Sequence, residues 1–145
     1  MIFLLDVESG VTQELSLTGL PNSDVSDPVW VDDGKRIAFV TRAAQSSRGG
    51  RVWMVSANGG QASPLTAESV QALAPAFTKD GRLIAYFAPD SGGRMQVWVQ
   101  EISSTNGPSH APMRLTNHAD VTTTRVRWTP NGRELVYSAD GRLWK

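Results

Sequence analysis

The chain holds two histidines, and these are the first residues to examine for catalysis or metal binding. His110 and His118 are eight positions apart, and Asp120 follows the second histidine by two. An imidazole beside a carboxylate can hold a metal ion or move a proton, so His118 and Asp120 are a candidate metal or acid–base pair. The alternative is an exposed pair in a surface loop, and this is what we expect.

Asp32 and Asp33 are a second candidate, as paired carboxylates for general acid–base work. Side chains of consecutive residues diverge, however, and an aspartate before Gly34 is already explained by hairpin chemistry. The motifs of serine hydrolases, zinc proteases, phosphate loops and dinucleotide sites are absent from the sequence. Without cysteine there is no thiolate nucleophile or zinc–thiolate site. We therefore predict no catalytic residue, no cofactor and no metal site in this chain.

Charge argues against two classes of partner. Fourteen basic and fourteen acidic residues give a formal net charge of zero, so no overall field attracts nucleic acid or an anionic membrane. The apolar run Met1–Leu5 ends at Asp6 and has no basic flank, which is too short for a signal peptide or a membrane span. We expect no nucleic-acid partner and no membrane span, and the compartment stays unknown.

A repeat supplies the elements that must position any site. An aromatic residue is followed four positions later by glycine and five positions after that by a second aromatic residue. The glycines lie 47 and 51 residues apart. The three copies are Trp30, Gly34 and Phe39, then Phe77, Gly81 and Tyr86, then Trp128, Gly132 and Tyr137.

Two further markers recur once per period. An aromatic residue in an alternating run occurs at Phe3, Trp53, Trp98 and Trp144. A Leu-Thr pair occurs at Leu17-Thr18, Leu65-Thr66 and Leu115-Thr116. Because the tryptophans recur with the period, we expect them to pack in the core rather than to form a stacking platform for bases or sugars.

Each period is predicted to form four short strands. Asp33-Gly34, Asp80-Gly81 and Asn131-Gly132 are strong hairpin signals, and no window shows convincing helical spacing. Four strands per unit at a period near 50 residues are typical of β-propeller blades, so the predicted fold class is all-β with four-stranded antiparallel blades. With strands labelled A to D outwards from the axis, we expect a half blade (C-D) at 1–18, blades at 28–66 and 75–116, and a partial blade (A-B-C) at 125–145.

The repeats also resemble a known family. Residues 27–39, 74–86 and 127–137 are similar to the blade motif P-x-W-S-P-D-G-K-x-I-A-F of TolB-like, WD40-like propellers, with Val31, Thr78 and Thr129 in place of the serine. Such blades occur in bacterial periplasmic translocation proteins and in propellers attached to hydrolases. The resemblance therefore implies a propeller and suggests a periplasmic or secreted location, without fixing a function.

About three blades do not close a ring, because propellers have four to eight. We expect either a longer parent protein with a ring of six to eight blades, or association with a second copy, of which six blades from two chains is the simplest version. Residues 1–34 hold seven acidic residues and no basic one, whereas residues 114–145 hold six basic and three acidic residues. On this basis the chain alone is expected to dimerise or aggregate, with its acidic first part against its basic last part.

Two functions fit these features. We expect a non-catalytic module that binds a protein or peptide through the face built by the D–A and B–C connections. The alternative is the propeller of a larger hydrolase of amidohydrolase, tricorn or prolyl-oligopeptidase type, which the sequence flanking this segment would distinguish. The candidate binding residues in the loops are Arg42, Arg48, Glu68, Arg94, His118 and Asp120.

Overall fold

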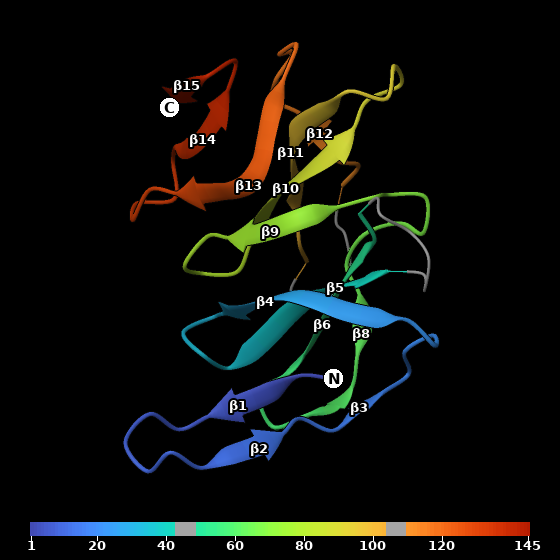
Figure 1. The fold of residues 1–145 in the computed structure, drawn as a ribbon, viewed down its shortest axis with the longest axis vertical. Coiled ribbons are helices and arrows are strands. Elements are labelled where there is room, and N and C mark those ends of the chain that lie inside the picture. Colours follow the sequence, from blue (N-terminus) through green and yellow to red (C-terminus); the bar gives the residue numbers. More distant parts are fainter. Residues whose placement is uncertain (43–48, 104–109) are drawn as a thin grey trace.

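The computed structural model describes residues 1–42, 49–103 and 110–145. Within these ranges the chain is all-β and contains no helix, as the sequence predicts. Figure 1 shows the strands stacked along the long axis of the molecule, from the N-terminal hairpin to the C-terminal one. No helix in the described ranges is therefore long and apolar enough to cross a membrane.

Fifteen short strands follow one another through turns and loops in the described chain. They are β1 (Phe3–Leu5), β2 (Thr12–Glu14), β3 (Leu17–Thr18), β4 (Asp24–Val31), β5 (Arg36–Arg42), β6 (Arg51–Ser56), β7 (Gly60–Gln61), β8 (Ser63–Pro64), β9 (Leu73–Phe77), β10 (Leu83–Pro89), β11 (Met95–Glu101), β12 (Met113–Arg114), β13 (Val121–Trp128), β14 (Leu135–Ala139) and β15 (Arg142–Trp144).

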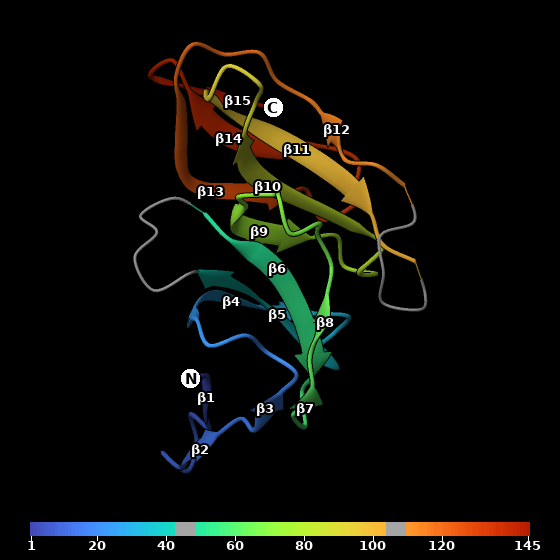
Figure 2. The same cartoon turned by 90° about the vertical axis from the view of Figure 1, so that its right-hand side faces the viewer.

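The strands pair as propeller blades. Blade 2 (β4-β5-β6-β8) and blade 3 (β9-β10-β11-β12) are four-stranded antiparallel sheets. Blade 1 is the hairpin β1-β2, and blade 4 is the three-stranded sheet β13-β14-β15. A short parallel pair, β3-β7, runs between blades 1 and 2. Figure 2 shows the blades side by side, which confirms the predicted fold class.

The hairpin turns form where the Asp-Gly and Asn-Gly steps predict them. Gly34, Gly81 and Gly132 all have positive φ, which glycine adopts without a clash. In the second turn the Thr78 hydroxyl donates to Asp80 Oδ1 at 2.6 Å and accepts from the Leu83 N–H at 3.1 Å. Thr129 repeats both bonds in the third turn. Threonine therefore makes the bonds that fix these turns at the position where the family motif has serine.

Each core cluster lies between two successive blades. Blades 1 and 2 share a cluster that includes Ile2, Leu15, Phe39 and Trp53, and two similar clusters join blades 2 and 3 and blades 3 and 4. Trp53 is 7% exposed, as expected for a core residue, whereas its counterpart Trp98 is only half-buried. Blades thus depend on their neighbours for burial.

The structure corrects the first copy of the Leu-Thr marker. The N–H of Leu65 donates to the Val52 carbonyl, and the N–H of Leu115 donates to the Val97 carbonyl. In blade 1 the matching bond runs from Leu15 to the Ile2 carbonyl. Leu15-Ser16 is therefore the first copy of the pair. The prediction of Leu17-Thr18 is wrong by two residues, and that pair lies in β3 instead.

Candidate functional site

The predicted binding loops lie on one side of the molecule. The β8–β9 connection and the β10–β11 turn project to the right in Figure 1 and face the viewer in Figure 2. Glu68 is exposed in the first of these, and Arg94 closes the second with its guanidinium 3.7 Å from the Asp90 carboxylate. Arg42 is held at 2.9 Å by Asp27. Arg48 lies outside the described residues.

His118 lies in the β12–β13 connection and pairs with Asp140 rather than with Asp120. Its Nδ1 is 2.7 Å from Asp140 Oδ2 and its Nε2 is 3.0 Å from the Tyr137 hydroxyl. The ring also lies 4.6 Å from the Trp144 ring, and its side chain is only 15% exposed. The expectation of an exposed histidine beside Asp120 is therefore wrong, because the turn after β14 brings a better partner to the same place.

These contacts give Asp140 a structural role. Asp140 Oδ1 accepts the backbone N–H of Asp120 at 3.0 Å, so one carboxylate ties the β12–β13 connection to the β14–β15 turn. This N–H and the His118 ring hold the pKa of Asp140 below its ordinary value. Burial, with a smaller effect of the Asp140 charge, raises the pKa of Tyr137. No group of metal-ligating side chains large enough to hold an ion occurs in the described ranges.

We expect replacement of Asp140 by asparagine to weaken the acid dependence of folding. Because the folded-state pKa is lowered, the stability contributed by the carboxylate is complete above the unfolded value near pH 4 and is lost as the pH falls through the folded value. Urea unfolding between neutral pH and about pH 3 should show a smaller drop in the free energy of unfolding for Asp140→Asn than for the unmodified chain. Asp120→Asn is the control, and an equal effect of both variants would contradict the role given to Asp140.

A groove runs along the inner strands. None of the binding residues that were predicted from the sequence and that lie in the described ranges lines it. This inner-strand groove has a volume of about 560 Å³ and is lined by Asp27–Trp30 of β4, Ala74–Phe77 of β9 and Thr124–Trp128 of β13. The three segments are the same part of the repeat in blades 2, 3 and 4. The groove is therefore a product of blade stacking, and its chemistry is set by residues that differ among the repeats.

Backbone irregularities shape the groove. The pairing register slips once in each inner strand, between Ser26 and Val29 in β4 and at matching places in β9 and β13. Asp27 and Ala74 at these bulges have positive φ, at 52° and 47°. A bulge leaves an extra residue without a partner in the ladder, so its backbone groups are open to a ligand.

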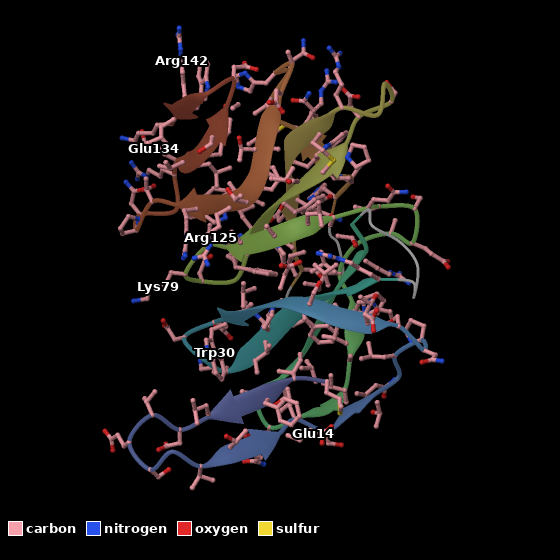
Figure 3. All side chains as sticks on the ribbon, viewed as in Figure 1. Glu14, Trp30, Lys79, Arg125, Glu134 and Arg142 are labelled. Carbon is pink, nitrogen blue, oxygen red and sulfur yellow. The ribbon has the colours of Figure 1, made fainter. Side chains whose placement is uncertain are left out.

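The groove carries unbalanced positive charge. The Asp27 carboxylate is neutralised by Arg42, whereas Arg125 and Arg127 are exposed and form no ion pair with any described residue. Trp30 is 58% exposed at the opposite wall. Figure 3 shows Trp30 of β4 and Arg125 of β13 on the same side of the molecule, with β9 between these two inner strands. In the sequence, only Arg125 and Arg127 indicate this charge. The other two copies of the repeat have Asp-Pro-Val and Ala-Pro-Ala at the same positions.

A second hollow of about 630 Å³ opens among the A–B turns and is lined by four acidic and two basic side chains. Lys79 lies 4.0 Å from Asp33, and Arg82 lies 3.9 Å from Glu101. Exposed pairs of this kind contribute little to stability, but they engage both basic side chains that line this hollow, unlike Arg125 and Arg127 in the inner-strand groove. The inner-strand groove is therefore the stronger candidate site.

Comparison with known proteins shows the fold. No family model and no curated protein matches the chain. Among solved structures it is similar to TolB from Acinetobacter baumannii (23% identity, TM-score 0.63, 81% of this chain and 27% of that one). It is also similar to a putative TolB from Agrobacterium tumefaciens (14% identity, TM-score 0.69, 93% and 46%). A third match is the β-propeller domain of the Trilobed protease from Pyrococcus furiosus (17% identity, TM-score 0.59, 79% and 34%).

The chain spans less than half the length of each of these structures. At these identities the likeness concerns the fold, which is that of TolB-like β-propeller blades. The sequence resemblance found in the repeats is thereby confirmed at the level of the fold. Function has to be argued from the groove.

Proposed function

We propose that this chain is a non-catalytic propeller module that binds an extended acidic segment of a protein in the inner-strand groove. The observation that carries the proposal is that Arg125 and Arg127 line the groove without an ion pair among the described residues. A carboxylate-bearing ligand would pair with these guanidinium groups, which suit carboxylates geometrically.

The size and backbone of the groove support a peptide ligand. A volume of about 560 Å³ is within the range of pockets that hold small ligands or short peptide segments. The bulges at Asp27 and Ala74 leave backbone groups available beside the groove, and peptide recognition commonly uses main-chain hydrogen bonds for affinity and side-chain pockets for specificity. The resemblance of the repeats to TolB-like propellers supports a periplasmic or secreted location as part of this proposal.

The loop face remains a second candidate surface for a protein partner. Its candidate residues within the described ranges are Arg42, Glu68, Arg94, His118 and Asp120. Arg42 and His118 are engaged by Asp27 and Asp140, which leaves Glu68, Arg94 and Asp120 as the more accessible members. The likeness to the propeller domain of a protease supports the alternative that the module belongs to a hydrolase and receives its substrate.

Binding of a fluorescein-labelled octapeptide of aspartate and glutamate, followed by fluorescence anisotropy, tests the groove. Each exposed charge pair contributes up to roughly 1 kcal/mol, so the double variant Arg125→Ala/Arg127→Ala should raise the Kd about tenfold. The control is Arg94→Ala/Arg142→Ala, which removes the same charge from the loop side. Weaker binding by the control variant alone would show that the peptide binds to the loop face. Equal weakening by both variants would show that the peptide binds only by unspecific charge attraction.

A further inference from the structure

Exposed apolar side chains gather at the two ends of the blade stack. Every large hydrophobic residue of the described chain that is exposed lies within residues 1–30 or 113–144. Between these two segments, residues 31–112 expose no large hydrophobic side chain in the described ranges. The exposed residues are Met1, Phe3, Leu5, Val7, Val11, Trp30, Met113, Leu115, Leu143 and Trp144.

At the N-terminal end, β1 has one covered face and one open face. Ile2 and Leu4 pack toward blade 2, whereas Phe3 and Leu5 are 55% and 62% exposed. β1 pairs with β2 and, in the described chain, with no strand on its other edge. Beside this edge lies a hollow of about 210 Å³ that is walled by β1 and Trp30. An unpaired strand edge next to an apolar hollow is a template for another strand.

At the C-terminal end, the outer part of blade 3 is uncovered. Leu15, Leu65 and Leu115 occupy the same position in three blades, yet they are 4%, 0% and 47% exposed. The first two are covered by the following blade. Leu115 lies instead in an apolar hollow of about 340 Å³, together with Met113 and Tyr137. The three residues of β15 beside this hollow are all exposed, so β15 covers it poorly.

The two ends are complementary in charge. Residues 1–34 carry seven acidic residues and no basic one, and residues 114–145 carry six basic and three acidic residues. Figure 3 shows Glu14 and Arg142 at opposite ends of the molecule, too far apart to neutralise each other within one chain. Unlike ends therefore attract, and like ends repel.

We propose that two copies of this chain join end to end, with β1 of one copy replacing β15 beside β14 of the other. Phe3 of one copy then lies opposite Tyr137 of the other. Trp144 occupies this position opposite Tyr137 in the single chain, and Trp53 lies opposite Phe39 in the same way in blade 2. In this register Phe3 and Leu5 enter the hollow at Leu115 and Met113. The strands β13 and β14 of one copy and β1 and β2 of the other complete a four-stranded blade.

The same contact covers Trp30. Within one chain, the Trp128 indole N–H donates to the Ala76 carbonyl of the preceding inner strand at 3.1 Å. Trp30 is the equivalent residue of blade 2, and β13 of the second copy becomes its preceding inner strand. Its indole N–H then has the Arg127 carbonyl of that copy as acceptor. Two such contacts related by a twofold axis close a ring of six blades, which leaves no free end for further growth.

Light scattering after size exclusion tests the proposal with the full chain. At micromolar concentration the mass should be twice 15.7 kDa, and added salt should weaken the dimer because the ends attract by charge. Phe3→Lys and Leu115→Lys each place a charge in the apolar contact and should each raise the dimer Kd by more than about tenfold. Both residues are exposed in the single chain, so circular dichroism should show an unchanged fold. Val11→Lys, in the β1–β2 connection, is the matched control.

A mixture of the two variants makes the test specific. Phe3→Lys keeps an intact C-terminal end and Leu115→Lys keeps an intact N-terminal end, so together they should form a heterodimer through one contact. Deleting Arg142–Lys145 removes the strand that β1 must replace and should tighten the unmodified dimer. A monomer, an open polymer, no heterodimer in the mixture, loss of association in only one variant, or a weaker dimer after the deletion would each overturn the proposal.

Discussion

Replacing Trp53 by alanine is expected to lower the free energy of unfolding by about 3–5 kcal/mol, the usual range for a large aromatic side chain removed from a packed interior. Trp53 is 7% exposed and packs with Ile37, Phe39 and the N-terminal hairpin. Its indole N–H donates to the Thr41 hydroxyl at 2.9 Å, a bond that the alanine variant also loses. Urea unfolding followed by far-ultraviolet circular dichroism measures the change.

Trp144 provides the matched control, because it is the same residue type at the same position of the repeat. It is 38% exposed, and its indole N–H donates to a backbone carbonyl at 3.0 Å. The loss for Trp144→Ala should stay near 1 kcal/mol, well below that for Trp53→Ala. Trp53→Phe should recover part of the loss, since it keeps most of the apolar area. Equal losses at the two tryptophans would mean that burial between blades is not what stabilises the third strand.

The blades could be predicted because their signals are local. Asp80-Gly81 and Asn131-Gly132 specify tight turns through the positive φ of glycine, and alternation places apolar residues on the faces that meet other blades. The register of the outer strand was harder to predict. Leu15-Ser16 and Leu17-Thr18 both place a leucine before a hydroxyl residue, and positions two apart point to the same face of a strand. In the structure, the bond from Leu15 to the Ile2 carbonyl and the pairing of Leu17-Thr18 with β7 distinguish them.

The candidate site was less predictable because its residues meet through packing. His118 and Asp140 are 22 positions apart, and they approach each other only because the connection from blade 3 to blade 4 lies beside the β14–β15 turn. Asp120 was the nearer carboxylate in sequence, but its backbone rather than its side chain takes part. Arg125 faces the groove because β13 bulges beside β9, and alternation alone does not locate a bulge.

The second large effect is expected at Gln96, a polar side chain with no exposed surface. Its Nε2 donates to the His118 carbonyl at 2.9 Å, and its Oε1 accepts from the Thr116 hydroxyl at 2.7 Å and from the His118 N–H at 3.1 Å. The Thr116 oxygen in turn accepts the Val97 N–H. One amide therefore joins the third strand of blade 3 to the connection that leads into blade 4.

Gln96→Leu keeps a similar volume but leaves the Thr116 hydroxyl and both backbone groups of His118 without these partners. Unpaired polar groups that stay away from water cost about 1–3 kcal/mol each, and partial access of water to the His118 backbone reduces the sum, so we expect a loss of about 3 kcal/mol. The same substitution at exposed Gln71 should change the free energy of unfolding by less than about 0.5 kcal/mol.

Hydrogen exchange distinguishes a loosened connection from a general loss of stability. Because Gln96 holds the His118 N–H directly, exchange of that amide should accelerate more in Gln96→Leu than exchange of the Phe39 and Val40 amides in blade 2. Uniform acceleration at all three amides would show that the variant destabilises the whole stack. In that case Gln96 would contribute through packing alone, and the connection into blade 4 would be held by Asp140 and His118.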